Sequence, residues 1–74
     1  MSEKELLDII NDIRISNGDE CIELINKEIS LRKDLGFDSI DFATLTVRIE
    51  DACGIDVFED GLVDTFGEIL DKVK

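Results

Sequence analysis

A serine flanked by acidic and apolar residues lies near the middle of the chain, in the run Asp34-Leu35-Gly36-Phe37-Asp38-Ser39-Ile40-Asp41. Asp38 is a favourable N-cap, and Asp41 three residues later can complete a capping box, so Ser39 is expected in the first turn of a helix. A helix N-terminus has unpaired backbone N–H groups and partial positive charge, which stabilise a phosphate ester. The chemistry expected of the Ser39 hydroxyl is therefore attachment of a phosphate-linked group, and not nucleophilic catalysis.

Two helices are expected on either side of a long connection. Ser2 and Glu5 form a capping-box pattern, and the apolar residues after them recur at helical spacing, which predicts a first helix over about residues 3 to 15. The second helix should run from about Ser39 to Cys53 and end at Gly54, because glycine readily takes the left-handed conformation common after helix ends. Ser39 is thereby placed at the entrance of the second helix.

The remaining segments complete an all-α prediction. The connection over 16 to 38 is too apolar to float free, so it should pack across the bundle, with a short helical turn near 20 to 27. A last helix is expected after a capping box from Thr65 to Glu68. Residues 57 to 63 are ambiguous and can form a turn or so of helix. The chain 1–74 is thus predicted to be a single domain without strands: a bundle of three main helices plus one short helix, with a long loop between helices one and two.

The charge balance limits the classes of partner. The chain has 74 residues, with 8 Lys and Arg against 19 Asp and Glu and a net charge of −11. Nucleic acids and anionic membranes require basic surfaces, so we expect neither as a ligand and favour basic protein partners. A chain of this length forms one small core and leaves little room for a catalytic cleft, so an enzymatic function is not expected.

Histidine is absent, and Cys21 and Cys53 lack the spacing of paired metal ligands, so no metal site is predicted. Both cysteines stand in apolar patterns, and we expect two buried, reduced thiols. The first residues lack the basic segment and apolar run of an export signal, and no stretch reaches membrane-spanning length. A cytoplasmic monomer is therefore expected.

The second predicted helix carries two apolar stripes. At about 100° per residue, one face holds Phe42, Leu45, Ile49, Ala52 and Cys53, and the opposite face holds Ile40, Ala43 and Val47. One helix of a small bundle needs only one core face. The second stripe, with Glu50 and Asp51 on either side of it, is expected to dock in a partner groove lined with Lys or Arg. The alternative is that Ile40 and Val47 are buried under the connection or the short third helix.

The run from Asp34 to Asp41 resembles the prosthetic-group site of acyl carrier proteins, and the segment from Thr65 to Leu70 resembles the start of that family's last helix. The resemblance covers about residues 6 to 73. It implies that Ser39, with Asp38 and Ile40 beside it, bears a covalent 4′-phosphopantetheine derived from coenzyme A. The thiol of this group would hold acyl intermediates of fatty-acid or polyketide-type synthesis, and the protein itself would be non-catalytic.

The resemblance also implies partners. These are a phosphopantetheinyl transferase and a ketosynthase, acyl transferase or acyl/aminoacyl ligase with basic docking patches. In that family the second helix is the main recognition element. The residues expected in recognition are Asp41, Ala43, Val47, Glu50, Asp51, Glu59 and Asp60. The chain departs from the family at Thr44, Arg48 and Val57-Phe58, which bears on the choice of partner enzymes and not on the attachment chemistry.

Two other functions remain open at this point. The chain can be an aminoacyl or peptidyl carrier, which uses the same attachment. It can also be an unmodified acidic protein-interaction module in which Ser39 only begins a helix. A calcium-binding loop beginning at Asp56 is rejected, because Phe58 and Gly67 would stand where oxygen ligands are required.

Overall fold

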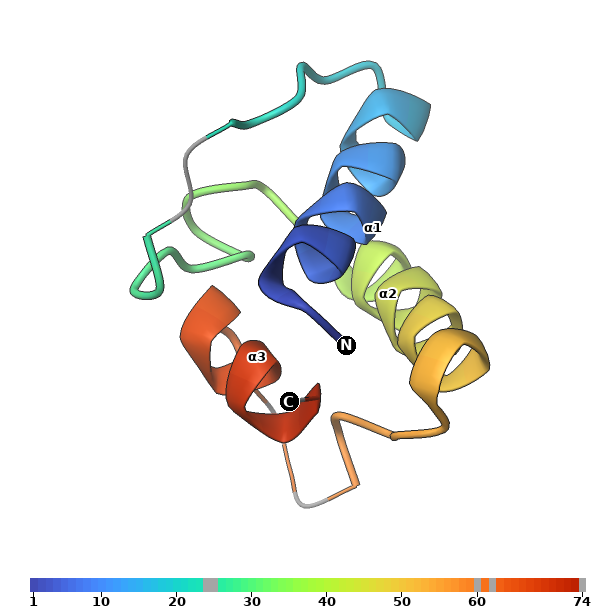
Figure 1. Ribbon diagram of the computed structural model, residues 1–74. Coiled ribbons are helices and arrows are strands. Elements are labelled where there is room, and N and C mark those ends of the chain that lie inside the picture. The colour runs from blue at the N-terminus through green and yellow to red at the C-terminus, as the bar shows by residue number, and fades with distance from the viewer. Residues whose placement is uncertain (24–25, 60, 62, 74) are drawn as a thin grey trace.

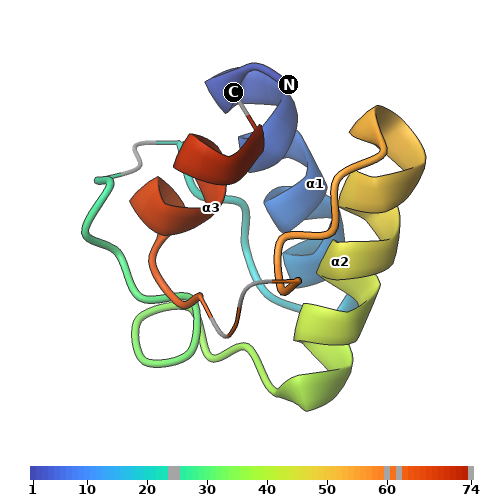
Figure 2. The same cartoon turned by 90° about the horizontal axis from the view of Figure 1, so that it is seen from below.

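The computed structural model describes residues 1–23, 26–59, 61 and 63–73, and these residues form three helices. They are α1 (Glu3–Ser16), α2 (Ser39–Cys53) and α3 (Phe66–Val73). In Figures 1 and 2, α1 and α2 lie side by side and run in opposite directions, and α3 lies beside the first half of α1. The all-α class is confirmed, since the only extended pairing among the described residues is an isolated bridge between Ser30 and Thr65. None of these helices is long and apolar enough to cross a membrane.

The helices begin and end where local signals predict. The Ser2 hydroxyl accepts the Glu5 N–H at 3.1 Å, and the Glu5 carboxylate accepts the Ser2 N–H at 3.3 Å. The bond from the Ser2 N–H to the Glu5 carboxylate is the largest cause that holds the pKa of Glu5 below its usual range, and the Ser2 side chain adds to it. Thr65 and Glu68 make the same reciprocal pair before α3, with the same effect on the pKa of Glu68. Gly54 ends α2 at φ 75°, in the left-handed conformation.

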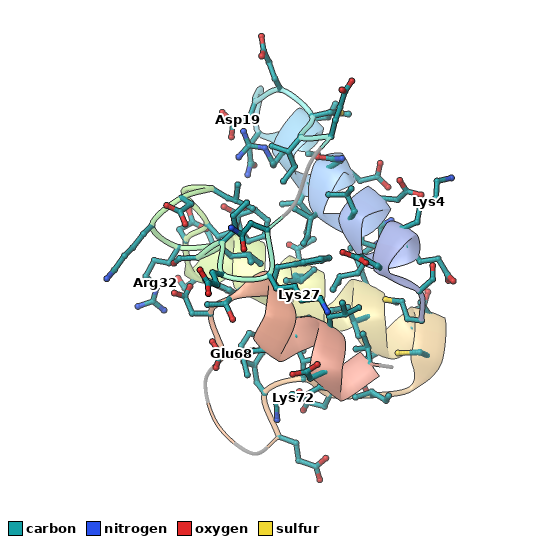
Figure 3. All side chains as sticks on the ribbon, turned by 60° about the vertical axis from the view of Figure 1, so that its left-hand side comes forward. Lys4, Asp19, Lys27, Arg32, Glu68 and Lys72 are labelled. Atoms are coloured by element: carbon teal, nitrogen blue, oxygen red, sulfur yellow. The ribbon has the colours of Figure 1, made fainter. Side chains whose placement is uncertain are left out.

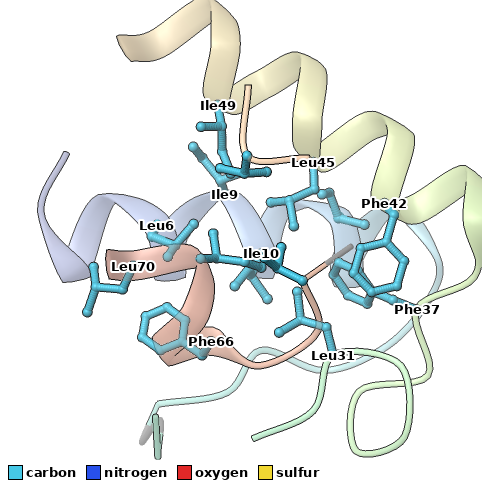
Figure 4. Close-up of a cluster of buried hydrophobic side chains, with 14 of the residues drawn as sticks. Leu6, Ile9, Ile10, Leu31, Phe37, Phe42, Leu45, Ile49, Phe66 and Leu70 are labelled. Atoms are coloured by element: carbon cyan, nitrogen blue, oxygen red, sulfur yellow. The ribbon is translucent and has the colours of Figure 1, made fainter. Parts of the chain in front are cut away.

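The core is built from one face of each helix and from apolar residues of the connections. Figure 4 shows side chains from α1, α2 and α3 meeting Leu31 and Phe37, which belong to the segment between α1 and α2. Residues of this core with no exposed side-chain surface include Leu6, Ile10, Leu31, Leu45, Ile49, Val57, Phe66 and Ile69. Each such burial contributes about 1.5–3 kcal/mol relative to exposure. The connection is therefore part of the core.

Backbone pairing fixes the connection against the start of α3. The Leu31 N–H donates to the Asp64 carbonyl at 3.0 Å, and the Phe66 N–H donates to the Ile29 carbonyl at 3.0 Å. The prediction that this segment packs across the bundle is confirmed. The helical turn expected near 20 to 27 is not confirmed. Residues 20–23 are not helical, and residues 24 and 25 lie outside the described residues. A single turn follows at 26–29.

The segment between α2 and α3 forms turns where it is described. The Glu59 N–H donates to the Asp56 carbonyl at 3.2 Å, and the Gly61 N–H donates to the Phe58 carbonyl at 3.1 Å. Residues 60 and 62 lie outside the described part of the chain. The expected short helix is not confirmed.

The expectation of two buried thiols is half wrong. Both cysteines are free, and Cys53 is half-buried, but Cys21 is exposed. The cause lies next to Cys21, where the Asn11 side chain pairs with both the N–H and the C=O of Ile22, at 2.8 and 2.9 Å. Ile22 packs against the core in this arrangement. Its neighbour Cys21 remains exposed.

We expect Gly67→Ala to destabilise the protein, although alanine is ordinarily the better helix former by about 0.8–1.0 kcal/mol. A Cβ atom at Gly67 would lie 2.9 Å from the Lys27 backbone oxygen, which already accepts the Gly67 N–H. Overpacking of this kind costs about 1–3 kcal/mol, measurable by chemical denaturation. The matched control Asp71→Ala, on an exposed part of α3, should change the free energy of unfolding by less than about 0.5 kcal/mol. Equal stability of the two variants would contradict the tight approach of the connection.

Candidate functional site at the start of α2

Ser39 is the first residue of α2, and its side chain is exposed. The cap that places it there is reciprocal: the Asp38 carboxylate accepts the Asp41 N–H at 2.9 Å, and the Asp41 carboxylate accepts the Asp38 N–H at 3.2 Å. The predicted capping box is confirmed. The Ser39 hydroxyl makes no hydrogen bond with the described residues, so it is free for attachment.

Asp41 also joins the two long helices. Its second carboxylate oxygen accepts a hydrogen bond of 2.8 Å from the Asn17 side chain, at the end of α1. Only 9% of the Asp41 surface is exposed. Both carboxylate oxygens accept hydrogen bonds inside the protein, so few of their lone pairs are available to a partner. The Asp41 carboxylate thus acts as a brace, that is, it connects the start of α2 to the end of α1. This differs from its expected place in recognition.

The chain that leads into α2 is held in a defined path. Gly36 has φ 72°, a left-handed conformation that L residues rarely adopt. The Arg14 guanidinium donates to the Leu35 carbonyl at 3.1 Å, and the Phe37 N–H donates to the Leu31 carbonyl at 2.9 Å. Phe37 is buried directly before the cap. The position of Ser39 is therefore fixed from both sides of the cap.

A cavity of about 270 Å³ opens beside Ser39. Its wall is formed by Arg32, Ser39, Phe42, Ala43, Thr46, Phe58 and Val63. The rings of Phe42 and Phe58 meet edge to face, with centroids 5.8 Å apart. The Thr46 hydroxyl donates to the Phe42 carbonyl at 2.8 Å and so presents no unpaired polar group. The interior of the cavity is largely apolar.

Sequence reasoning did not place Arg32, Phe58 or Val63 beside Ser39, although Phe58 is one of the departures from the family. Phe58 and Val63 come from the segment before α3, and Arg32 comes from the turn before α2. The carbon at the centre of the Arg32 guanidinium lies 5.7 Å from the centroid of the Phe42 ring. No local pattern marks these residues, because their proximity to Ser39 results from how the two connections cross the core.

The opposite face of α2 is exposed. The exposed fractions of Ile40 and Val47 are 73% and 65%, and Ala43 is exposed as well. The alternative in which Ile40 and Val47 are buried under a connection is therefore wrong. The predicted core face of α2 is confirmed for Phe42, Leu45 and Ile49, which are buried. Ala52, which is expected on the same face, is exposed. Ile40 does not line the cavity beside Ser39.

Two of the acids expected in recognition lie on this exposed side of α2. Glu50 and Asp51 are exposed and line a shallow hollow with Val47. Glu59 is exposed on the turn after α2, and Asp60 lies outside the described residues. We call Ile40, Ala43, Val47, Glu50 and Asp51 the outer strip.

Arg48 is the basic residue of α2, and it contacts α1. Its guanidinium lies 3.0 Å from the Asp12 carboxylate, with 45% and 59% of the two side chains exposed. Exposed pairs of this kind contribute between 0 and about 1 kcal/mol. The positive charge is thus partly neutralised within the protein.

The arrangement at Ser39 suits attachment better than catalysis. The carboxylate of Asp38 is engaged in the cap, and the chain has no histidine that could serve as a base. Within residues 1–23, 26–59, 61 and 63–73, no group of three or more metal-ligating side chains occurs. The site presents an exposed hydroxyl at a helix N-terminus, between an apolar cavity and an exposed apolar strip that meet at Ala43.

Comparison with known proteins agrees with this chemistry. The family described as "Phosphopantetheine attachment site" matches residues 5–71. The chain is 34% identical over 76 residues to acyl carrier protein 3 of Ralstonia nicotianae, covering all of this chain and 87% of the relative. It is 30% identical to the acyl carrier protein of Lactobacillus johnsonii, covering 95% of that protein, and 32% identical to that of Saccharopolyspora erythraea, covering 77%. No solved structure is a significant match.

We expect Asp41→Ala to lower the free energy of unfolding by about 1–3 kcal/mol, because it removes half of a capping box and the acceptor for Asn17. The exposed acid Asp51 on the same helix provides the matched control: Asp51→Ala should change stability by less than about 0.5 kcal/mol. Asn17→Ala should cost about 1 kcal/mol, and less than that in an Asp41→Ala background. An Asp41→Ala protein with normal stability and weakened partner binding would instead restore Asp41 to the recognition surface.

Proposed function

Because this chain belongs to the acyl carrier protein family, we propose that Ser39 is the residue that bears its covalent 4′-phosphopantetheine. Carriers of this family are non-catalytic, and the thiol of the attached group holds the cargo as a thioester. Ser39 is supported by its exposed, unpaired hydroxyl and by its position as the first residue of α2. This exposed serine at a capped helix start is the observation on which the proposal depends.

The residues around Ser39 fit the group. A phosphodiester on the first turn of α2 would lie at the partially positive end of a helix of 15 residues. Asp38 and Asp41 are engaged with each other and with Asn17, so their carboxylates are directed into the cap. The role of the chain is to hold the attachment point in place and to leave its outer side open.

The cavity beside Ser39 supports an acyl cargo over an aminoacyl one. Its volume of about 270 Å³ exceeds the roughly 150 Å³ that suffices for a benzene-sized ligand in an apolar cavity. Its apolar wall would shelter a short hydrocarbon chain. A free ammonium group would meet the positive charge of Arg32 instead. We therefore favour acyl intermediates of fatty-acid or polyketide-type synthesis.

The outer strip is our candidate for partner recognition. Ile40, Ala43 and Val47 are exposed on the helix that begins with Ser39, and Glu50 and Asp51 flank Val47. Partners with basic patches would bury the apolar residues and pair with the acids. Those partners would be a phosphopantetheinyl transferase and a ketosynthase, acyl transferase or acyl ligase. A cytoplasmic location, expected from the sequence, is part of this proposal.

The attachment is tested by incubating the protein with coenzyme A, magnesium and a broad-specificity phosphopantetheinyl transferase. We expect the wild type to gain one phosphopantetheine by intact-mass spectrometry. Ser39→Ala should gain none and keep its helical circular dichroism, because the Ser39 hydroxyl makes no bond that the fold needs. Ser16→Ala, at the exposed end of α1, is a control that leaves the attachment residue intact and should still be modified. An unmodified wild type, with several competent transferases, would favour the acidic interaction module.

Changes on the outer strip should weaken transfer without unfolding the protein. Val47→Glu adds a charge that is solvated in the free protein but desolvated in a docked complex, which costs a few kcal/mol. Ile15→Glu is the matched control, since Ile15 is 57% exposed on α1. Both variants should melt within a few degrees of wild type, and only Val47→Glu should raise the KM of a partner enzyme. If Val47→Glu unfolds the chain, the strip is structural.

Charge reversal tests the acids of the strip. Glu50→Lys with Asp51→Lys should reduce the association rate with a basic partner, and the loss should shrink as salt rises. Glu3→Lys with Asp8→Lys makes the same charge change on exposed positions of α1. Equal losses in the two double variants would show that net charge acts, and not the outer strip.

A further inference from the structure

Arg32 is a cation at the border of the Ser39 cavity, in a chain with a net charge of −11. Figure 3 shows its side chain extending from the turn before α2, at the edge of the molecule. Acidic residues are far more numerous than basic ones in this protein. A positive charge beside the candidate attachment residue therefore requires an explanation.

The backbone at Arg32 is held firmly. Its N–H donates to the Asp64 carboxylate at 3.1 Å, and the Ser30 hydroxyl donates to the other oxygen of Asp64 at 2.5 Å. The bond from Ser30 is the largest cause that keeps the pKa of Asp64 below its usual range, so the carboxylate is charged at neutral pH. The Asp34 N–H closes the turn onto the Ser30 carbonyl at 2.8 Å. Arg32 thus projects from a fixed turn.

The guanidinium lies over the face of α2 that holds the attachment residue. Ser39 and Phe42 are three residues apart, so their side chains are neighbours on the helix surface. The Arg32 guanidinium carbon lies 5.7 Å from the Phe42 ring centroid, and both residues line the cavity with Ser39. The guanidinium is within cation–π range of the Phe42 ring, and this contact favours its position beside the cavity. Arg48 forms an ion pair with Asp12, whereas no carboxylate of the described residues lies within ion-pair distance of Arg32, whose charge acts on Asp64 from further away.

We propose that the Arg32 guanidinium binds the phosphodiester oxygens of the group attached to Ser39, and so holds the root of the arm against the mouth of the cavity. This rests on the proposed attachment at Ser39. A phosphodiester there would add negative charge to a chain whose net charge is already −11, and a nearby cation would offset it. The planar guanidinium matches two phosphate oxygens at once.

A carboxylate at the far end of an acyl group would present the same anionic chemistry. The phosphodiester is the better ligand on two grounds. It is fixed directly to a residue of the cavity wall, whereas a distal carboxylate is carried by a flexible arm whose ordering opposes binding. It is also present in every loaded form of the protein. Arg32 is accordingly a positioning residue for the arm, in addition to its repulsion of a cationic cargo.

The test compares apo and modified protein by NMR after intact mass has confirmed attachment at Ser39. We expect the Arg32 Nε–Hε resonance to move on modification, while those of Arg14 and Arg48 stay in place. In modified Arg32→Gln, the ³¹P resonance should differ from that of modified wild type and lie closer to that of a free phosphodiester. Modification should raise the melting temperature by about 2–6 °C in wild type, and this gain should vanish in Arg32→Gln.

Lys33→Gln removes the same charge from the next residue, which does not line the Ser39 cavity, and should keep the ³¹P resonance and the thermal gain. Arg32→Lys keeps the charge without the planar fork and should retain part of both, which separates binding from a loss of folding. Equal effects of Arg32→Gln and Lys33→Gln would overturn the proposal. So would an Arg32 resonance that moves only after loading with a succinyl group, because the ligand would then be the cargo carboxylate. An unchanged mass would instead refute the attachment itself.

Discussion

The carboxylate of Asp41 is the interaction on which the geometry of the site depends. It accepts the Asp38 N–H across the cap and the Asn17 side chain at the end of α1. One nearly buried acid therefore fixes where α2 begins and how that beginning sits against α1. Since Ser39 lies between the two residues of the cap, its exposure and direction follow from this brace. The acidic composition of the chain is thus partly structural.

The same constraint explains how one helix serves two purposes. Fixing the start of α2 fixes its rotation, so Phe42, Leu45 and Ile49 face the core and Ile40 and Val47 face solvent. Leaving these two side chains exposed forfeits about 1.5–3 kcal/mol each relative to full burial. A small domain tolerates that loss because its core recruits Leu31, Leu35 and Phe37 from the connection. Residues of the connection thus fill a part of the core that a further helix would otherwise fill.

The sequence predicts those features whose causes are local. The three capping boxes and the left-handed Gly54 each act within a few residues, so the bounds of α2 and the starts of α1 and α3 follow from pattern. The exposed Cys21 and the placement of Arg32 do not, because each is decided by a partner far along the chain. The Asn11 side chain forms hydrogen bonds with Ile22, and the neighbouring Cys21 is left exposed. The Asp64 carboxylate accepts the Arg32 N–H and so fixes the turn that contains Arg32. Nothing near either residue in the sequence signals those contacts.

The size of the outer strip sets a limit on the strength of docking. Complete burial of Ile40 and Val47 would contribute about 3–6 kcal/mol together. A nanomolar complex requires about 12 kcal/mol, after association has already cost about 4 kcal/mol or more. Exposed acids such as Glu50 and Asp51 act mainly on encounter and register, and add little to the lifetime of a complex. As the proposed docking surface, the strip is therefore suited to short contacts with successive partners, and the fixed cap would present Ser39, the proposed attachment point, in the same way to each of them.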